Sequence, residues 1–449
     1  MRSCKSMFGA AMVAIFWIPQ GLWAADSIPP DTPLANPERA ADMVPDAVAQ
    51  ATQLFAQGKL DAARTLLAQL MRAPEPNLQV LFLSAQLAEH DGDLTRAAAL
   101  YRDMLNRDPA LIRPRLELGR VLFLQGDYDG ATYHFERVLA SPLPPQVVTN
   151  VERFIKQMRE QEGYFNVSVS LTPDSNANQG ASSRQVVIQG LTYTLSDNTK
   201  PQSTLGMDVL LNGRHNFGKA RKTFVRGYAD YQDFPGRTWD FTYLLGYAGH
   251  NFDLDGRHTL TLEGGYQQAY SQHQLLFSGW ALRAADFVRL KPNLAVELAL
   301  DSRRFNYNRA NAFYTGTHTI FSTTALYSPN TISQWRGGVS LTRATAQIDP
   351  YAYTSPSLQL EYYRELPWQK LSSGTRLSLS GSRYDQTDPF YGVLRKDKNA
   401  RLEQDLTKRD WNWHGFAPRV TIGVVRNQSN IALFDYVRWY MRITASRNF

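Results

Sequence analysis

The pattern of apolar and polar positions along the chain changes once, close to residue 163. Before this point apolar residues recur at helical spacing, and beyond it they alternate with polar residues almost to the C-terminus. Alternation is clear where Phe165, Val167 and Val169 are separated by Asn166 and Ser168. Such alternation places one set of side chains on each face of a strand. The pattern therefore predicts an α+β multidomain protein, in which a helical region precedes a large antiparallel sheet.

The helical region, residues 46–162, contains an internal repeat of 34 residues. Each unit has a glycine followed five residues later by an alanine, at Gly58 and Ala63, Gly92 and Ala97, and Gly126 and Ala131. This is the tetratricopeptide pattern, in which the glycine lies in the turn between two antiparallel helices and the alanine lets them pack closely. We expect three units and a capping helix over 145–162. Two roles stay open for this stack, a rigid spacer or a concave groove for a peptide or a partner.

Residues 163–449 contain about fourteen alternating segments, each long enough to cross a bilayer when tilted. Apolar residues such as Leu298 and Leu300 share one side, and charged residues such as Asp301 the other. A soluble β-sandwich also alternates, but rarely has so many long strands. We therefore predict a transmembrane antiparallel β-barrel. Its strands should start near Gly163, Ser203, Thr223, Trp239, His258, Gln274, Asn293, Thr315, Thr331, Thr354, Thr375, Asn399, Phe416 and Tyr436.

The connections between the predicted strands differ in length. Those after even-numbered strands are mostly tight, as at 218–222 and 253–257, and several after odd-numbered strands are longer, as at 172–202 and 385–398. Short turns belong on the periplasmic side of an outer-membrane barrel. The helical repeats, which precede the first strand, are therefore expected in the periplasm of a Gram-negative bacterium. Tryptophans at or near strand ends would form an aromatic girdle: Trp239, Trp335, Trp368, Trp411, Trp413 and Trp439.

Residues 1–25 have the features of a secretory signal peptide, and residues 26–45 those of a linker. Arg2 and Lys5 precede an apolar stretch that is too short to anchor the chain as a membrane-spanning helix. The one cysteine, Cys4, also precedes that stretch, so we expect neither lipidation there nor a disulfide. The formal net charge is +7, but both signs are mixed along the chain. This distribution does not indicate a nucleic-acid partner.

The chain ends on an amphipathic segment whose last residue is Phe449. Met441 and Ile443 lie on one face of this segment together with Trp439. A terminal aromatic residue on a final amphipathic strand resembles the signal by which the barrel assembly machinery recognises its clients. Arg447 departs from that signal, because an apolar residue is usual there. An ordinary last strand is the alternative.

No set of residues in the sequence indicates catalysis. Residues 213–219 match the spacing of a phosphate-binding loop, but Ala220 stands where a hydroxyl is needed, and the context is strand, turn and strand. The eight histidines are far apart, without metal-ligand spacing. An outer-membrane hydrolase would need a Ser or an Asp/His pair at the outer rim, which we do not find. We expect no enzyme activity and no cofactor. Charges of both signs should brace the lumen: Glu263, Glu297, Asp301, Arg303, Arg376, Arg401, Glu403, Asp405, Arg438 and Arg442.

The junction between the two regions carries a short motif made of Pro173, Asp174, Ser175, Asn176, Ala177 and Asn178. Together with the signal peptide, the tetratricopeptide stack, the capping helix and the barrel, this motif resembles the surface lipoprotein assembly modulator family, Slam. The resemblance covers almost the whole mature chain, and all of the motif except Ala177 matches the family's signature. A purely structural turn is an equal interpretation, because Asn tolerates a left-handed backbone and bonds locally.

The resemblance implies an outer-membrane translocator of the type XI secretion pathway. Such a protein delivers surface lipoproteins, or soluble haem- or iron-binding proteins, to the bacterial surface, and the family is not known for catalysis. The partners we expect are the client protein, outer-membrane lipid, the barrel assembly machinery and periplasmic chaperones. The alternative is an exopolysaccharide export porin, which shares the plan of repeats and barrel but usually has a longer helical array.

Overall fold

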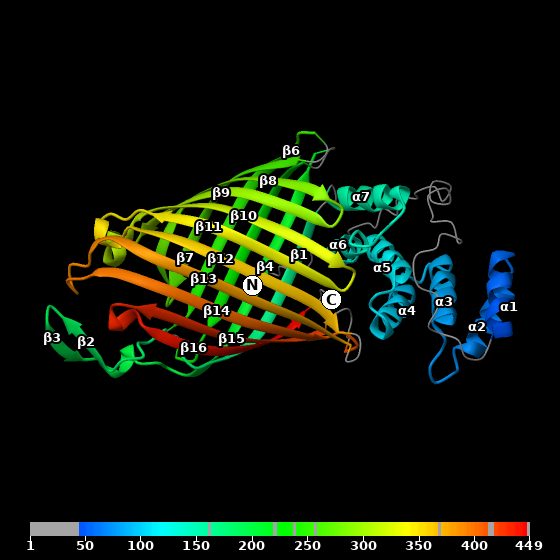
Figure 1. Cartoon of the computed structure of the whole chain (residues 1–449), viewed down its shortest axis with the longest axis horizontal. Helices are drawn as coiled ribbons and strands as arrows, with labels where there is room; N and C mark the ends of the chain where they lie inside the picture. The colour runs from blue at the N-terminus through cyan, green and yellow to red at the C-terminus, as the bar shows by residue number, and fades with distance from the viewer. Residues whose placement is uncertain are drawn as a thin grey trace, which may run out of the picture.

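The computed structural model describes residues 45–159, 163–218, 222–236, 239–255, 258–366, 370–411 and 417–446. These residues form a helical region and a barrel, which lie end to end (Figure 1). The predicted signal peptide, almost all of the predicted linker, and Phe449 lie outside the described residues. None of the described helices is both long enough and apolar enough to cross a membrane.

The helical region consists of consecutive helices that pack in antiparallel pairs. Within the described residues they are α1 (Pro45–Ala56), α2 (Leu60–Leu70), α3 (Leu78–His90), α4 (Leu94–Arg107), α5 (Ile112–Leu124), α6 (Tyr128–Val138) and α7 (Pro145–Arg159). The turn inside each pair has a glycine with a positive φ, at Gly58 (70°), Gly92 (78°) and Gly126 (79°). A left-handed residue ends a helix at the lowest cost if it is glycine. The 34-residue spacing of these glycines therefore follows from the geometry of the turn.

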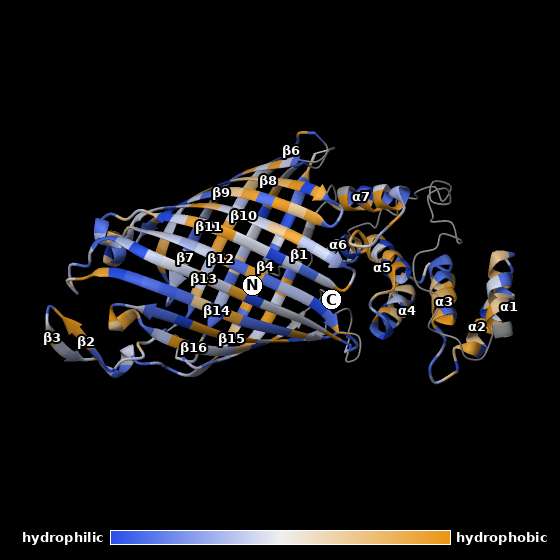
Figure 2. Ribbon diagram, in the orientation of Figure 1, coloured by the Kyte–Doolittle hydropathy of each residue, from blue (hydrophilic) through white to orange (hydrophobic). Residues whose placement is uncertain are grey.

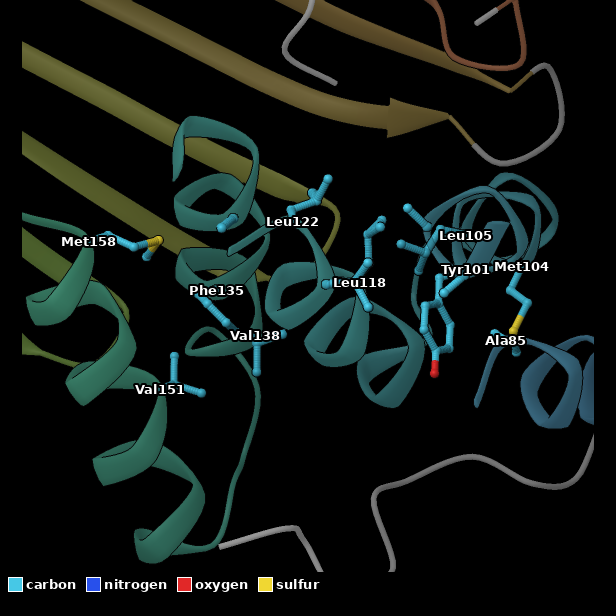
Figure 3. Packing of buried hydrophobic residues seen from close by; sticks show 14 of the residues in the cluster. Ala85, Tyr101, Met104, Leu105, Leu118, Leu122, Phe135, Val138, Val151 and Met158 are labelled. Carbon is cyan, nitrogen blue, oxygen red and sulfur yellow. The ribbon is translucent and has the colours of Figure 1, made fainter. Parts of the chain in front are cut away.

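One continuous apolar core runs from α3 to α7 (Figure 3). The three repeat alanines, Ala63, Ala97 and Ala131, are fully buried, so the two helices of each pair can approach closely. Phe135 of α6 stacks on Phe154 of α7 with 5.3 Å between the ring centroids, which joins the capping helix to the stack. These observations confirm the predicted tetratricopeptide architecture.

Within the described residues, fourteen strands close an antiparallel barrel in which each strand pairs with its neighbours in the sequence, and β1 also pairs with β16. They are β1 (Gly163–Asp174), β4 (Thr204–Phe217), β5 (Thr223–Asp233), β6 (Phe241–Asp253), β7 (His258–Ser271), β8 (Gln274–Lys291), β9 (Leu294–Tyr307), β10 (Gly316–Asn330), β11 (Ser333–Ala344), β12 (Tyr353–Leu366), β13 (Leu371–Thr387), β14 (Leu394–Lys408), β15 (Ala417–Ser429) and β16 (Tyr436–Ser446). The predicted barrel and its number of strands are confirmed.

The structure differs from the expected strands in three places. A hairpin of β2 (Gln185–Ile188) and β3 (Leu191–Thr194) lies in the long connection after β1, where no strand was expected. Strands β13 and β14 start four or five residues before the predicted positions. The start of β14 was missed because the residues that follow Leu394, from Arg395 to Asn399, are polar on both faces, although the pairing of Asp397 with Ser429 continues the sheet. The expected start at Phe416 lies outside the described residues.

Apolar and polar residues alternate along the strands of the barrel (Figure 2), and large apolar side chains are exposed on its outer face. Phe165, Phe321 and Trp439 are 68%, 56% and 58% exposed on the outer face. The register continues this face from strand to strand, for example where Val169 pairs with Val209. An apolar band around a polar interior is the arrangement that a bilayer requires of a barrel.

The two ends of the barrel differ in their connections. The helical region and the short turns lie at one end, on the right of Figure 1. The longer connections at the other end contain η2 (Asp197–Thr199), η3 (Arg309–Tyr314), η4 (Asp349–Tyr351) and η6 (Ala432–Phe434). We refer to these ends as the periplasmic end and the extracellular end.

Candidate functional site: the barrel lumen and the helical region at its mouth

One side of the lumen is lined by an ion-pair network on β5, β7, β8 and β9. Arg283 lies at its centre, with Nη2 2.6 Å from Glu297 and Nη1 2.7 Å from Asp301. Arg226 binds Glu263 through Nε at 2.5 Å. The alternating register places Glu263, Arg283 and Asp301 on the inner face of the adjacent strands β7, β8 and β9, so the network ties these strands together along the lumen wall.

A second network lies on the opposite part of the wall, around Glu403 of β14. Arg376 of β13 and Arg442 of β16 contact its two carboxylate oxygens at 2.6 and 2.7 Å, and the hydroxyl of Tyr440 also donates to it. Arg376 reaches Glu361 of β12 at 3.4 Å as well. The charged lumen residues are therefore mostly compensated by partners of the opposite sign, as expected of charges that brace a barrel.

Between these networks the lumen contains a small basic cavity. Arg401, Arg438 and Arg442 line it together with Asp208 and Tyr440, and its volume is about 180 Å³. The wall of the lumen thus presents both signs of charge.

The junction motif closes the seam between the first and last strands. Asp174 is buried and forms an ion pair with Arg438 of β16 at 2.5 Å. The side-chain amide of Asn176, which is fully buried, donates to the carbonyl oxygens of Gly180 and Val437 at 3.0 Å each. Its Oδ1 accepts the N–H of Gly180 at 2.7 Å. Asn176 therefore folds its own loop and fixes that loop to β16.

The other polar residues of the motif act in the same place. Ser175 exchanges two hydrogen bonds with Trp439, of 2.9 Å from its N–H and 2.8 Å to its hydroxyl oxygen. Asn178 instead bonds within its loop, to the carbonyl of Lys200 at 2.7 Å and the N–H of Gln202 at 2.9 Å. Among the residues that the structure describes, β1 and β16 pair in register at three positions, against twelve between β1 and β4. The motif thus strengthens a seam that has few ladder pairs.

The helical region is fixed to the periplasmic rim by a buried charged cluster, which we call the rim cluster: Arg115, Tyr133, Arg137, Tyr363, Glu365 and Arg409. Glu365, at the end of β12, accepts from Arg115 of α5 at 2.7 and 3.1 Å and from Tyr133 of α6 at 2.6 Å. Arg409 contacts the same carboxylate at 3.4 Å. The side chains of Glu365, Arg115 and Arg409 are at most 4% exposed, so one carboxylate holds several guanidinium groups in a dry interface.

Further contacts extend the rim cluster along α6. The guanidinium of Arg137 lies between the rings of Tyr133 and Tyr363, 4.4 and 4.5 Å from their centroids. It also donates to the carbonyl of Thr331 at 3.4 Å. Beside it, burial lowers the pKa of His134 well below the ordinary value, so this imidazole is neutral. Arg409 also donates to the carbonyl of Leu105 in α4 at 3.3 Å, so the contacts between helices and barrel come from α4, α5 and α6.

The barrel matches a protein-family model over residues 164–449, and the model is described as "Surface lipoprotein assembly modifier". The chain belongs to this family. A tetratricopeptide model matches residues 48–111. The family match starts at β1, so the junction motif and the lumen networks are all inside it. This protein has a closed barrel with an apolar outer face and therefore lies in the outer membrane of a Gram-negative bacterium. Its helical region lies in the periplasm.

Comparison with individual proteins gives three informative relatives. "Surface lipoprotein assembly modifier 1" of Neisseria meningitidis serogroup B is 25% identical over 383 residues, 82% of this chain and 75% of that one. "Hemophilin secretion modulator" of Acinetobacter baumannii is 21% identical over 79% of this chain and 76% of its own length. "Cellulose synthase 2 operon protein C" of Komagataeibacter xylinus is 40% identical, but over 80 residues, which are 18% of this chain and 6% of that protein.

The final strand carries the other expected site residues. Met441 and Ile443 pair with Ile422 and Val420 of β15 on the outer face of the barrel, where Ile443 is 44% exposed. Phe449 lies outside the described residues, so the assembly signal stays a prediction. Among the residues that the structure describes, no group of His, Cys, Asp and Glu is arranged to hold a metal ion.

The sequence analysis missed the rim cluster. One signal was present, because Arg115 is three, four and seven residues before Leu118, Gly119 and Leu122, on the buried face of α5. A charged residue on the apolar face of a helix normally has a buried partner. The partner Glu365 is 250 residues away in the sequence, and no local pattern connects the two.

Proposed function

We propose that this protein is an outer-membrane translocator that delivers a protein client from the periplasm to the cell surface. The client is a surface lipoprotein or a soluble haem- or iron-binding protein. Family membership supports this proposal, as do the printed names of the relatives, which refer to surface lipoprotein assembly and to hemophilin secretion. In this proposal the barrel is the route or the insertion platform.

The observation that carries the proposal is the position of the tetratricopeptide stack. The rim cluster fixes α5 and α6 at the periplasmic mouth, and α1 to α3 extend from there (Figure 1). Tetratricopeptide stacks present an extended concave surface to peptides and partners. A client that binds this surface is held next to the entrance of the lumen, and we infer that the repeats receive the client.

The other candidate functions have less support. An exopolysaccharide exporter usually has a longer helical array, whereas the described helices make three repeat units. The relative with a cellulose-synthesis name matches 18% of this chain. A catalytic role has no support from the lumen residues, because the carboxylates and guanidiniums that we describe there pair with each other.

The test is deletion of residues 48–161, with surface labelling of a lipoprotein or haem-binding protein encoded at the same locus. The deleted protein should still insert as a heat-modifiable barrel, but the client should no longer be displayed. Undiminished display would contradict the receiving role of the repeats.

A second variant distinguishes binding of the client by the repeats from attachment of the repeats to the barrel rim. The double substitution Arg115→Ala and Arg137→Ala keeps all three repeats but removes two of the arginines that fix them to the rim. If the repeats act only when held at the mouth, this variant should also lose display. If display persists while the deletion abolishes it, the repeats bind the client without the fixed position.

A further inference from the structure

The connections at the extracellular end contain a group of aromatic side chains around one arginine. We call it the mouth cluster: Phe313, Tyr314, Tyr351, Tyr391, Arg395 and Phe434. Its members come from η3, η4, the connection between β13 and β14, the start of strand β14, and η6. We propose that the mouth cluster is the extracellular gate of the translocator, formed by loops that part when a client leaves. This inference rests on the proposed function for the identity of what passes.

The loops contact each other through their rings. Tyr351 of η4 lies 4.8 Å from Tyr314 and 5.1 Å from Phe313, measured between ring centroids, so η3 and η4 meet. Tyr391 lies 6.1 Å from Phe434, which brings the β13–β14 connection to η6. The guanidinium of Arg395 lies 3.4 Å from the centroid of the Phe434 ring. Four of the longer connections are thus joined in two pairs by ring and cation–π contacts.

The mouth cluster continues onto the inner wall of the barrel. Tyr314 contacts Tyr307, with 5.8 Å between centroids, and Arg395 lies 4.8 Å from the ring of Tyr384. Tyr307 shares the inner face of β9 with Asp301, six residues before it. Tyr384 pairs with Tyr353 at 5.3 Å. The loops therefore fold toward the lumen side and not onto the lipid-facing side.

Connections from the other side of the barrel reach the same region. Phe434 and Arg395 share a cavity of about 580 Å³ with Trp239, from the connection between β5 and β6. The loop of the junction motif, at Asn178 and Gly180, also lines this cavity. Side chains from opposite parts of the barrel thus converge over the lumen at its extracellular end.

The chemistry of these contacts suits a gate. Rings that stack in a polar setting separate without leaving a buried unpaired charge, so the closed and open arrangements differ little in cost. Aromatic constrictions also block ions and small solutes by excluding water from the passage. Loops with such contacts can open for a client and close after it.

The first test is the ion conductance of the purified full-length protein in planar bilayers. Tyr351→Ala, and the double variant Tyr314→Ala with Tyr351→Ala, should raise the conductance several-fold. The matched control is Tyr362→Ala, which removes an aromatic partner of Trp335 (4.3 Å between centroids) on the lipid-facing side and should leave the conductance unchanged. Equal conductance in Tyr351→Ala and the wild type would overturn the proposal. Heat-modifiability shows that each variant has folded.

The second test closes the gate. Because Cys4 is the one cysteine in the sequence, a Cys4→Ser background with Tyr314→Cys and Tyr351→Cys carries a single reactive pair. A short bismaleimide should link η3 to η4 and abolish client display, whereas either single cysteine variant treated alike should display normally. Failure to cross-link, or full display in the cross-linked protein, would contradict the gate. The conductance test needs no client, so it separates failure of the gate from failure of the proposed function.

Discussion

The two ends of the barrel are built with different chemistry. At the periplasmic end, Glu365 and its arginine partners are almost completely buried, and each guanidinium depends on one carboxylate. At the extracellular end, the contacts between loops are mainly those of rings, and Tyr314 remains 39% exposed. Removing one partner of a buried ion pair costs about 3–5 kcal/mol, whereas one aromatic pair contributes about 0.5–1.5 kcal/mol.

This difference indicates that the two ends do different work. A cluster in which every charge needs the same carboxylate cannot separate in small steps, so it holds the helical region in one position. A set of ring contacts loses its stability one pair at a time, so it allows loops to move. We therefore expect substitutions at the periplasmic end to have large, all-or-none effects, and those elsewhere to have smaller, graded effects.

The largest effect is expected from Glu365→Ala. It leaves Arg115, Arg137 and Arg409 without their shared carboxylate, at a cost of about 3–5 kcal/mol. Helices α5 and α6 should leave the rim, which hydrogen exchange of the purified protein would detect as loss of protection. The control is Glu361→Ala on the same strand and face, whose carboxylate is 29% exposed. Equal protection in the two variants would show that the rim cluster does not hold the helices.

A smaller effect at the periplasmic end is a dependence of the stability of the helical region on pH. Because burial lowers the pKa of His134 in the folded protein, the unfolded or undocked form binds a proton that the folded form does not. Stability of the helical region is therefore present above pH 6.5 and declines below it, by about 1.4 kcal/mol per pH unit. The surrounding charges are Arg102, Arg115, Arg137 and Glu365.

Chemical denaturation of the helical region at a series of pH values between 7.5 and 5, with proteolysis as the readout of unfolding, measures this dependence. His134→Phe keeps a ring of similar size and should flatten the dependence below pH 6.5. If the variant and the wild type lose stability in parallel, other groups cause the pH effect.

The sequence was sufficient to predict the barrel because alternation is a local property. Each strand carries its own period-two pattern, so the starts of strands such as β5, β7 and β16 match the predicted residues. The pattern is weakest where both faces are polar, and β14 was accordingly predicted to start too late. The hairpin of β2 and β3 was missed for a different reason, because each of its strands has four residues, too few for a clear alternation.

The candidate site could be predicted only in part, because its contacts join distant residues. The charges of the lumen were visible as one face of each strand, but the sequence does not say which carboxylate meets which arginine. Asn176 could be recognised as part of a motif, whereas its bond to Val437 spans 261 residues. The rim cluster was least visible, since the charges of Arg115 and Arg137 belong to helices that otherwise match the repeat.

A moderate effect is expected at the seam between β1 and β16. Asn176→Ala removes the donor to the carbonyl of Val437 and leaves buried polar groups unpaired, which costs about 1–3 kcal/mol. The temperature at which the folded band disappears in heat-modifiability gels should fall. Asn178→Ala is the matched control, because the side chain of Asn178 bonds to Lys200 and Gln202 in its own loop. An equal fall of this temperature in both variants would show that Asn176 has no special role in joining β1 to β16.

The smallest effect is expected inside the helical repeats, at Gly92. Its φ of 78° is strained for an L-residue, and the space around an added Cβ is empty within 4 Å, so only backbone strain opposes Gly92→Ala. The cost should be about 1 kcal/mol. Gly92→Asn should cost less, because Asn tolerates this conformation. The thermal unfolding of the helical region measures both changes. Since the turn at Gly92 is not part of the rim cluster, protection of α5 and α6 should stay at the wild-type level. Its loss would mean that the repeats and the rim unfold as one unit.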